Sequence, residues 1–205
     1  VEAFRSGEDI HRRTAAEVFG VMQPLVTVDQ RRAAKAINFG IVYGMSAFRL
    51  ARELRIPRRE AQRYMDDYFA RYPQVRRFME TSVAQAREKG YAETLWGRRR
   101  PVHGLDHKQR NLREAAERIA INTPVQGTAA DVIKLAMIRV HRLLKERFPA
   151  TKLLLQVHDE LVLEVPQGDL DAVREAVCAE MVAVGDFAVP LVVDSGDGAT
   201  WDEAH

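Results

Sequence analysis

Apolar residues recur every third or fourth position through most of this chain, which is the spacing of helices with one buried face. We expect a first helix to begin at Gly7-Glu8-Asp9 and a short hairpin or irregular loop over residues 91–104. Asp29 and Ser46 are the expected N-caps of the two helices that follow the first. A kink is expected near Pro124 and Gly127, where the helical pattern is interrupted. The remaining helices are predicted over residues 26–44, 46–56, 57–72, 74–90 and 108–148.

The pattern changes after residue 150, where short apolar runs of strand length appear. It predicts strands over 152–157 and 160–165, a helix over 169–184 and a last strand over 189–194. This order gives a β-β-α-β segment with an antiparallel sheet. Helices first and a sheet afterwards indicate the α+β class.

One predicted helix carries an unusual polar face. Arg31, Lys35, Phe39 and Tyr43 recur every fourth residue and therefore share one stripe of the helix. Two cations followed by two aromatic rings suit a nucleotide, because the cations can meet phosphates and a ring can meet the sugar or base. An amphipathic helix whose aromatic residues belong to the core would give the same pattern.

Gly40 and Gly44 lie on the same predicted helix. A glycine within a helix costs about 1 kcal/mol relative to alanine. We therefore expect another group to approach the backbone closely at these two positions.

A second candidate site lies where two apolar strands join. The segment "LLLQVHDELVLEV" places His158, Asp159 and Glu160 between runs apolar enough to be buried. A tight surface turn would explain a single Asp, but it would not explain a pair of carboxylates beside a His. Carboxylates at a strand end suit Mg²⁺, although a two-metal site needs at least one further acid from another strand.

Two further segments allow more than one interpretation. Residues 46–64 resemble a helix-turn-helix that reads DNA, but a packed helical hairpin fits them as well. Asn122 and Gln126 flank Pro124, where amide groups suit base edges or sugars. The same amides would also satisfy backbone groups that the proline leaves unpaired.

Charge is distributed unevenly along the chain. Residues 1–120 hold 24 Lys and Arg against 15 Asp and Glu, whereas residues 121–205 hold 7 against 14. This asymmetry indicates a polyanion held by the first part and a metal ion by the second, although a solvated helical surface would also produce it. A single cysteine, Cys178, favours a reducing, cytoplasmic setting. No apolar run approaches the roughly 20 residues that span a bilayer, so no membrane partner is expected.

Several long motifs occur together and in a fixed order: "RRAAKAINFGIVYG", "ETLWGRRR", "REAAERIAINTPVQGTAAD" and "QVHDELVLE". In this order and spacing the chain resembles the C-terminal part of a family A DNA polymerase, of the DNA polymerase I type. The resemblance covers nearly all 205 residues. It implies template-directed nucleotidyl transfer with two Mg²⁺ ions, with primer-template DNA and deoxynucleoside triphosphates as partners.

The resemblance also implies roles for individual residues. Contacts to the incoming nucleotide fall to His11, Arg31, Lys35, Phe39 and Tyr43, and contacts to DNA fall to Arg118, Asn122, Gln126 and His158. Asp159 resembles a metal-binding catalytic acid, with Glu160 beside it. The implied domains are a palm-to-fingers connecting helix over 1–28, the fingers over 29–104 and a partial palm over 105–205.

One departure from the family pattern stands out. The family's other palm motif, with the second metal-binding aspartate, is missing from these 205 residues and is expected upstream of Val1 together with the thumb. We therefore interpret the chain as a fragment that needs an upstream polymerase segment as a partner. A non-catalytic DNA-binding module built on residues 46–64 and a single-subunit RNA polymerase remain alternatives.

Overall fold

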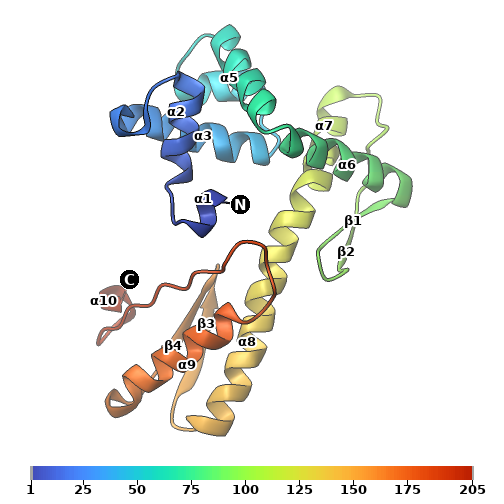
Figure 1. Ribbon diagram of the computed structural model, residues 1–205. Coiled ribbons are helices and arrows are strands. Elements are labelled where there is room, and N and C mark those ends of the chain that lie inside the picture. Colours follow the sequence, from blue (N-terminus) through green and yellow to red (C-terminus); the bar gives the residue numbers. More distant parts are fainter. Residues whose placement is uncertain (1, 205) are drawn as a thin grey trace. The chain divides into compact units, whose positions relative to one another are not determined.

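The computed structural model describes residues 2–204, which fall into two compact units (Figure 1). The first unit is Glu2–Thr128, and the second covers residues 129–204. In the described residues, no helix is both long enough and apolar enough to cross a membrane. The predicted α+β class is confirmed, since helices dominate and two small antiparallel sheets accompany them.

The first unit is a set of helices with one short hairpin (Figure 1). Ile37, Ile41 and Leu50 lie on two of these helices and are at most 1% exposed, and a third helix adds Tyr64 and Tyr68 to the same core. Its elements are α1 (Glu2–Arg5), α2 (Ile10–Phe19), the 3₁₀ turn η1 (Gln23–Leu25), α3 (Val28–Val42), α4 (Ala47–Leu54), α5 (Arg58–Arg71), α6 (Pro73–Lys89), β1 (Tyr91–Glu93), β2 (Arg99–Pro101), α7 (Arg110–Asn122) and the π-helical turn η2 (Thr123–Gly127).

Helix α3 begins two residues earlier than the predicted cap implied. Thr27, and not Asp29, is its N-cap: the Thr27 side chain accepts from the Gln30 backbone N–H, and the Gln30 side chain accepts from the Thr27 N–H. This reciprocal pair satisfies two backbone groups at once, which a lone Asp29 could not do. Ser46 caps α4 as predicted.

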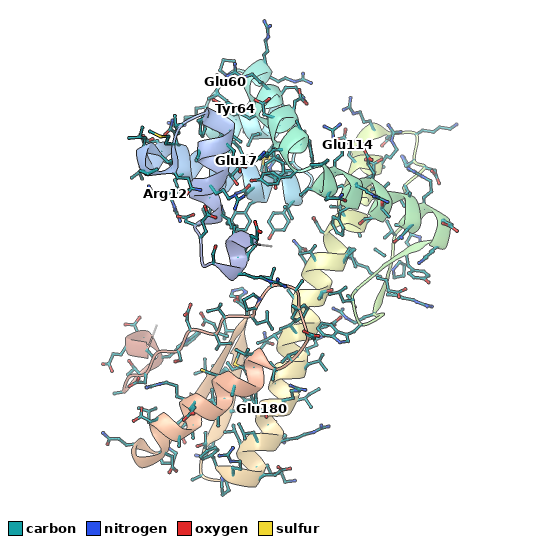
Figure 2. All side chains as sticks on the ribbon, in the orientation of Figure 1. Arg12, Glu17, Glu60, Tyr64, Glu114 and Glu180 are labelled. Carbon is teal, nitrogen blue, oxygen red and sulfur yellow. The ribbon has the colours of Figure 1, made fainter. Side chains whose placement is uncertain are left out.

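The segment that resembles a helix-turn-helix forms a packed helical hairpin. Leu50 and Ala51 on α4 are buried together with Ala61, Tyr64 and Tyr68 on α5. Tyr64 donates a hydrogen bond to Glu60 at 2.6 Å, one turn earlier on α5 (Figure 2). The apolar faces of both helices are therefore used within the unit.

The second unit packs a hairpin and a helix against one long helix (Figure 1). Val140, Leu143 and Leu144 of the long helix meet Val173 and Val177 in its core. Its elements are α8 (Thr128–Arg147, whose first residue belongs to the other unit), β3 (Lys152–Val157), β4 (Glu160–Glu164), the turn η3 (Gln167–Asp169), α9 (Leu170–Val182) and α10 (Trp201–Ala204).

Two predictions for the second unit were wrong. The segment 189–194 forms no strand, so β-β-α is present without its last β. A strand needs a partner for its backbone groups, and β3 and β4 pair here only with each other. The hairpin is also buried on one face only: Leu153 and Leu163 join the core, whereas Leu154 and Leu155 are 51% and 52% exposed.

Candidate functional site

The predicted stripe on α3 is exposed, and the opposite face is the core. Phe39 is 46% exposed and Tyr43 is 41% exposed, while Ala34, Ile37 and Ile41 are buried. The Phe39 and Tyr43 rings lie nearly parallel, with centroids 6.1 Å apart. The alternative in which these aromatic residues form the core is therefore wrong, and the rings are available for a ligand.

Helix α2 adds His11 to this face. Its ring centroid lies 5.6 Å from that of Phe39. Asp9, which precedes α2, accepts hydrogen bonds from the backbone N–H groups of His11 and Arg12 through Oδ1. Its other oxygen, Oδ2, lies 2.6 Å from Nε of Arg31. One carboxylate thus caps the helix that carries His11 and holds the cation on α3.

These contacts change the protonation of both groups. The hydrogen bond from Arg31 is the main reason why the pKa of Asp9 is lowered, so this carboxylate is ionised at neutral pH. Burial lowers the pKa of His11, and the charges of Arg31 and Lys35 lower it further against the opposing effect of Asp9. His11 is therefore neutral near pH 7.

A second contact holds His11 from the side of α3. The Asn38 side-chain nitrogen lies 3.1 Å from Nδ1 of His11 and 3.1 Å from the Thr14 hydroxyl oxygen. Neither Asp9 nor Thr14 was a predicted site residue. The signal was present in "DIHRRTA", because Asp9 precedes a helix and Thr14 lies close to His11 on the same helix.

The glycines of the α3 segment are approached by the protein's own side chains. A Cβ on Gly40 would lie 3.0 Å from Sδ of Met45. Gly44 has φ +71°, and a Cβ there would lie 3.1 Å from Cγ of Arg118. The expected close approach is confirmed, and it brings Arg118 of α7 against Gly44, the residue that follows Tyr43 in the chain.

The predicted kink after α7 is a π-helical turn. The hydroxyl of Thr123 donates to the carbonyl of Ile119, that of Thr128 donates to the carbonyl of Pro124, and Arg98 donates to the carbonyl of Gly127 at 2.9 Å. Hydroxyls and a guanidinium therefore satisfy the loosened backbone, and the neighbouring amide side chains do not.

The two predicted amides at this turn differ in exposure. Gln126 is exposed, whereas Oδ1 of Asn122 is buried without a hydrogen-bond partner among the described residues. A buried polar atom without a partner is rare in folded proteins. Neither amide satisfies the loosened backbone of the turn, and a DNA contact by either of them stays a prediction.

The carboxylates of the second unit lie at the tip of the β3–β4 hairpin. Val157 pairs with Glu160, so His158 and Asp159 form the two-residue turn that the sequence predicted. His158 has φ +53°, a left-handed conformation that is uncommon for a residue other than glycine. Asp159 is exposed and makes no hydrogen bond or ion pair with residues 2–204.

This tip suits Mg²⁺ only in part. The carboxylates of Asp159 and Glu160 are oxygen ligands of the kind that Mg²⁺ prefers. Within the described part of the chain, however, no group of three or more His, Cys, Asp and Glu side chains could hold a metal ion. The donors present therefore fit one side of a metal site, and further ligands are needed.

A network that the sequence did not reveal joins α2 to the α5–α6 junction. Glu17, labelled in Figure 2, accepts a hydrogen bond from the Tyr72 hydroxyl and is approached at 3.4 Å by both Arg13 and Arg71. Burial, helped by Glu17, raises the pKa of Tyr72 to about 12. Only the Arg13–Glu17 spacing of four residues was visible in the sequence, because Tyr72 is 55 residues away from Glu17.

Comparison with known proteins identifies the family. The sequence model that describes DNA polymerase family A matches residues 1–203. This chain belongs to DNA polymerase family A. The chain is 53% identical over 205 residues to DNA polymerase I of Pseudomonas aeruginosa and 49% identical over 201 residues to the thermostable DNA polymerase I of Thermus aquaticus.

These relatives of the family A chain are much longer. The chain is covered to 100% and 98% by these matches but spans only 22% and 24% of the two polymerases. A solved structure, the POL domain of Pol1 from M. smegmatis in complex with DNA primer-template and dNTP, covers 99% of this family A chain with a TM-score of 0.93 and 44% identity. The chain covers 36% of that structure.

Proposed function

We propose that this chain forms the fingers and part of the palm of a DNA-directed DNA polymerase, a nucleotidyltransferase of DNA replication and repair. The observation that carries the proposal is the exposed face of α3, where Arg31, Lys35, Phe39 and Tyr43 are joined by His11 from α2. Membership in family A and the similarity to a polymerase domain with primer-template and dNTP support it. The proposed parts are a connecting segment over 1–28, fingers over 29–104 and a partial palm over 105–205.

The nucleotide-binding face combines charge with aromatic surface. Arg31 and Lys35 would hold the triphosphate oxygens, and His11 would add a hydrogen bond. Phe39 and Tyr43 would lie against the sugar and the templating base pair, since stacked rings make a sequence-tolerant surface for bases. Arg118, Asn122 and Gln126 would contact the primer-template close to the new pair, and His158 would lie near the primer terminus.

The catalytic role falls to the hairpin tip. Asp159, with Glu160 beside it, would hold Mg²⁺, which when bound stabilises charge on the attacking and leaving oxygens of nucleotidyl transfer. Because the described residues offer too few ligands for two ions, we propose that an upstream polymerase segment supplies the second aspartate and the thumb. A cytoplasmic location stays a prediction from the single cysteine.

A binding experiment tests the nucleotide-binding face. Lys35→Ala should weaken deoxynucleotide binding by about 1.5–3 kcal/mol, the range for a hydrogen bond to a charged group, and should weaken DNA binding less. Arg32→Ala is the matched control, because Arg32 also carries a positive charge on α3 but pairs with Asp29 on the exposed surface. Equal nucleotide affinity in wild type and Lys35→Ala, measured by calorimetry, would contradict the phosphate role.

A primer-extension experiment tests the catalytic half. Residues 1–205 alone should bind primer-template weakly, through salt-sensitive contacts of basic helices, and should not extend it. Addition of a polypeptide that carries the thumb and the missing aspartate should restore extension. Asp159→Ala controls for contaminating polymerase. Robust extension by residues 1–205 alone, lost in that control, would refute the need for an upstream segment.

A further inference from the structure

Asn38 lies between His11 and Thr14 in a short chain of hydrogen bonds. Its amide nitrogen is 3.1 Å from Nδ1 of His11 and 3.1 Å from Oγ1 of Thr14. Oγ1 of Thr14 lies 2.8 Å from the carbonyl oxygen of Ile10, one turn earlier on α2. Asn38 is half-buried and Thr14 is 4% exposed, so water has little access to these contacts.

The direction of each of these hydrogen bonds follows from the placement of the Asn38 amide and from the number of hydrogens that each group can donate. The Ile10 carbonyl has no hydrogen, so the single Thr14 hydroxyl hydrogen is donated to it and Oγ1 is left as an acceptor. The 3.2 Å contact from Oγ1 to Oδ1 of Asn38 would need that same hydrogen, and the shorter contact to Ile10 takes it. The Asn38 side-chain nitrogen, and not its oxygen, is the atom that lies 3.1 Å from both Oγ1 of Thr14 and Nδ1 of His11, so the amide donates one hydrogen to each of them.

The consequence concerns the imidazole of His11. A nitrogen that accepts a hydrogen bond carries no proton, so Nδ1 is bare and the proton of the neutral ring is on Nε2. Within residues 2–204, Nε2 makes no hydrogen bond. We infer that Asn38 and Thr14 are positioning residues that hold His11 as its Nε2–H tautomer, so that the ring offers one neutral donor to a nucleotide triphosphate.

This inference rests on the proposed function for its ligand, and its tautomer part stands on geometry. A neutral donor adds a hydrogen bond beside Arg31 and Lys35 without adding a third positive charge to repel them. The charged groups that act on His11 are Asp9 at the start of α2 and Arg31 and Lys35 on α3. From α5, which also packs on α2, Arg71 is directed to Glu17.

The experiment measures the tautomer directly. In a chain labelled with ¹⁵N-histidine, long-range ¹H–¹⁵N spectra report which ring nitrogen is protonated. We expect His11 of the wild type to carry its proton on Nε2. Asn38→Asp replaces the amide donor by a carboxylate acceptor, so the proton should move to Nδ1 and the pKa of His11 should rise in an NMR titration.

Two controls separate this effect from a loss of structure. Thr14→Val removes the acceptor that orients Asn38 and should mix the two tautomers, whereas Thr14→Ser keeps the hydroxyl and should preserve Nε2–H. His107 is the internal reference, because its Nδ1 accepts from the backbone N–H of Gln109 at 3.0 Å and should stay Nε2–H in every variant. A wild-type His11 protonated on Nδ1, or an unchanged tautomer in folded Asn38→Asp, would overturn the inference.

A nucleotide titration distinguishes this inference from the proposed function. Addition of dTTP and Mg²⁺ should shift the Nε2–H signal of wild-type His11, and Asn38→Asp should bind dTTP about threefold to tenfold more weakly. A second sample, labelled with ¹⁵N at both histidine and lysine, allows both residues to be followed. If its Lys35 signals respond to dTTP but those of His11 do not, the donor role is wrong while the proposed function stands. If neither responds, the ligand part fails together with the proposed function, and the tautomer is still decided by the first measurement.

Discussion

The two units prepare their candidate site residues in opposite ways. In Glu2–Thr128, Arg31 is held by Asp9 and His11 is held by Asn38. In the second unit, Asp159 is exposed at a hairpin tip and makes no ion pair with the described residues. Arg31 and His11 are already supported by neighbouring groups, whereas the Asp159 carboxylate has no such support from the described residues.

The difference follows from what each set is proposed to bind. A triphosphate is a large, flexible ligand, and side chains fixed beforehand lose less conformational entropy when they bind it. A metal ion instead orders the carboxylates that coordinate it, and a carboxylate already paired with a cation would have to leave that partner first. The unpaired carboxylate of Asp159 therefore suits a metal ligand, and the supported face of α3 suits a phosphate site.

The largest expected effect concerns Asp159 of the second unit. In a full-length polymerase that carries these residues, Asp159→Ala should reduce nucleotide incorporation by about a thousandfold or more, because metal catalysis supplies several kcal/mol. Primer-template binding should persist, since a carboxylate repels DNA phosphates. Glu164→Gln, at the other end of β4 and paired with Lys152, is the control and should keep normal turnover. Near-normal turnover by Asp159→Ala with Mg²⁺ would remove Asp159 from the catalytic site.

The next effect concerns the core beneath the supported face. Ile37→Ala should lower the free energy of unfolding by about 2–5 kcal/mol, because Ile37 is fully buried on the inner face of α3. Ile138→Ala makes the same chemical change on α8, where Ile138 is 47% exposed, and should cost less than about 1 kcal/mol. Urea unfolding of both variants provides the measurement. Similar losses in the two would show that α3 does not depend on its core as described.

A smaller effect is expected at the Glu17–Tyr72 contact. Tyr72→Phe should cost about 1.5 kcal/mol, the low end for a hydrogen bond to a charged group, since Arg13 and Arg71 remain beside Glu17. Because the pKa of Tyr72 is raised to about 12, the protonated Tyr72 adds fully to the free energy of unfolding below pH 10. This contribution is lost as the pH rises toward 12. The difference in the free energy of unfolding between wild type and Tyr72→Phe should therefore shrink between pH 10 and pH 12.

Chemical denaturation at several pH values measures this effect. Tyr91→Phe is the control, because the Tyr91 ring contacts Arg99 and its hydroxyl has no hydrogen-bond partner in the described part of the chain. A difference between Tyr72→Phe and wild type that grew above pH 10 would contradict the assigned contact.

The smallest effect tests the support of Arg31. Asp9→Asn keeps a helix cap and removes the charge, so it should cost less than about 1 kcal/mol at pH 7, as expected for a partly exposed pair. Because the pKa of Asp9 is lowered, the ionised carboxylate adds fully to the free energy of unfolding at pH values well above its ordinary pKa of 3.8. This contribution is lost as the pH falls through the lowered pKa.

The effect of Asp9→Asn should therefore fade in acid. Asp29→Asn is the control, because its pair with Arg32 is almost fully exposed and should contribute nothing measurable. Urea midpoints at pH 7 and pH 3 make the comparison. An Asp9→Asn effect that persisted undiminished at pH 3 would show that the charge is not responsible.

The sequence predicted what depends on local spacing. The stripe from Arg31 to Tyr43 follows from a repeat of four, and the two-residue turn at His158-Asp159 follows from strands without spare residues. It did not predict the Asn38–His11 contact, because these residues are 27 positions apart and meet only through packing of α2 on α3. The strand expected over 189–194 is absent for a related reason. A strand forms only where another strand pairs with it, and that pairing depends on residues far away in the sequence.

Position 158 has a narrow range of tolerated side chains. Its left-handed backbone is accessible to Gly and Asn, and a β-branched residue such as Val or Ile would be strained there whatever it contacts. The backbone therefore restricts variation at this position independently of any interaction of the imidazole ring. A saturation library at position 158 would separate the backbone constraint from the role of the ring. Gly and Asn would keep the hairpin tip but lose the imidazole, whereas Val would disturb the backbone that positions Asp159.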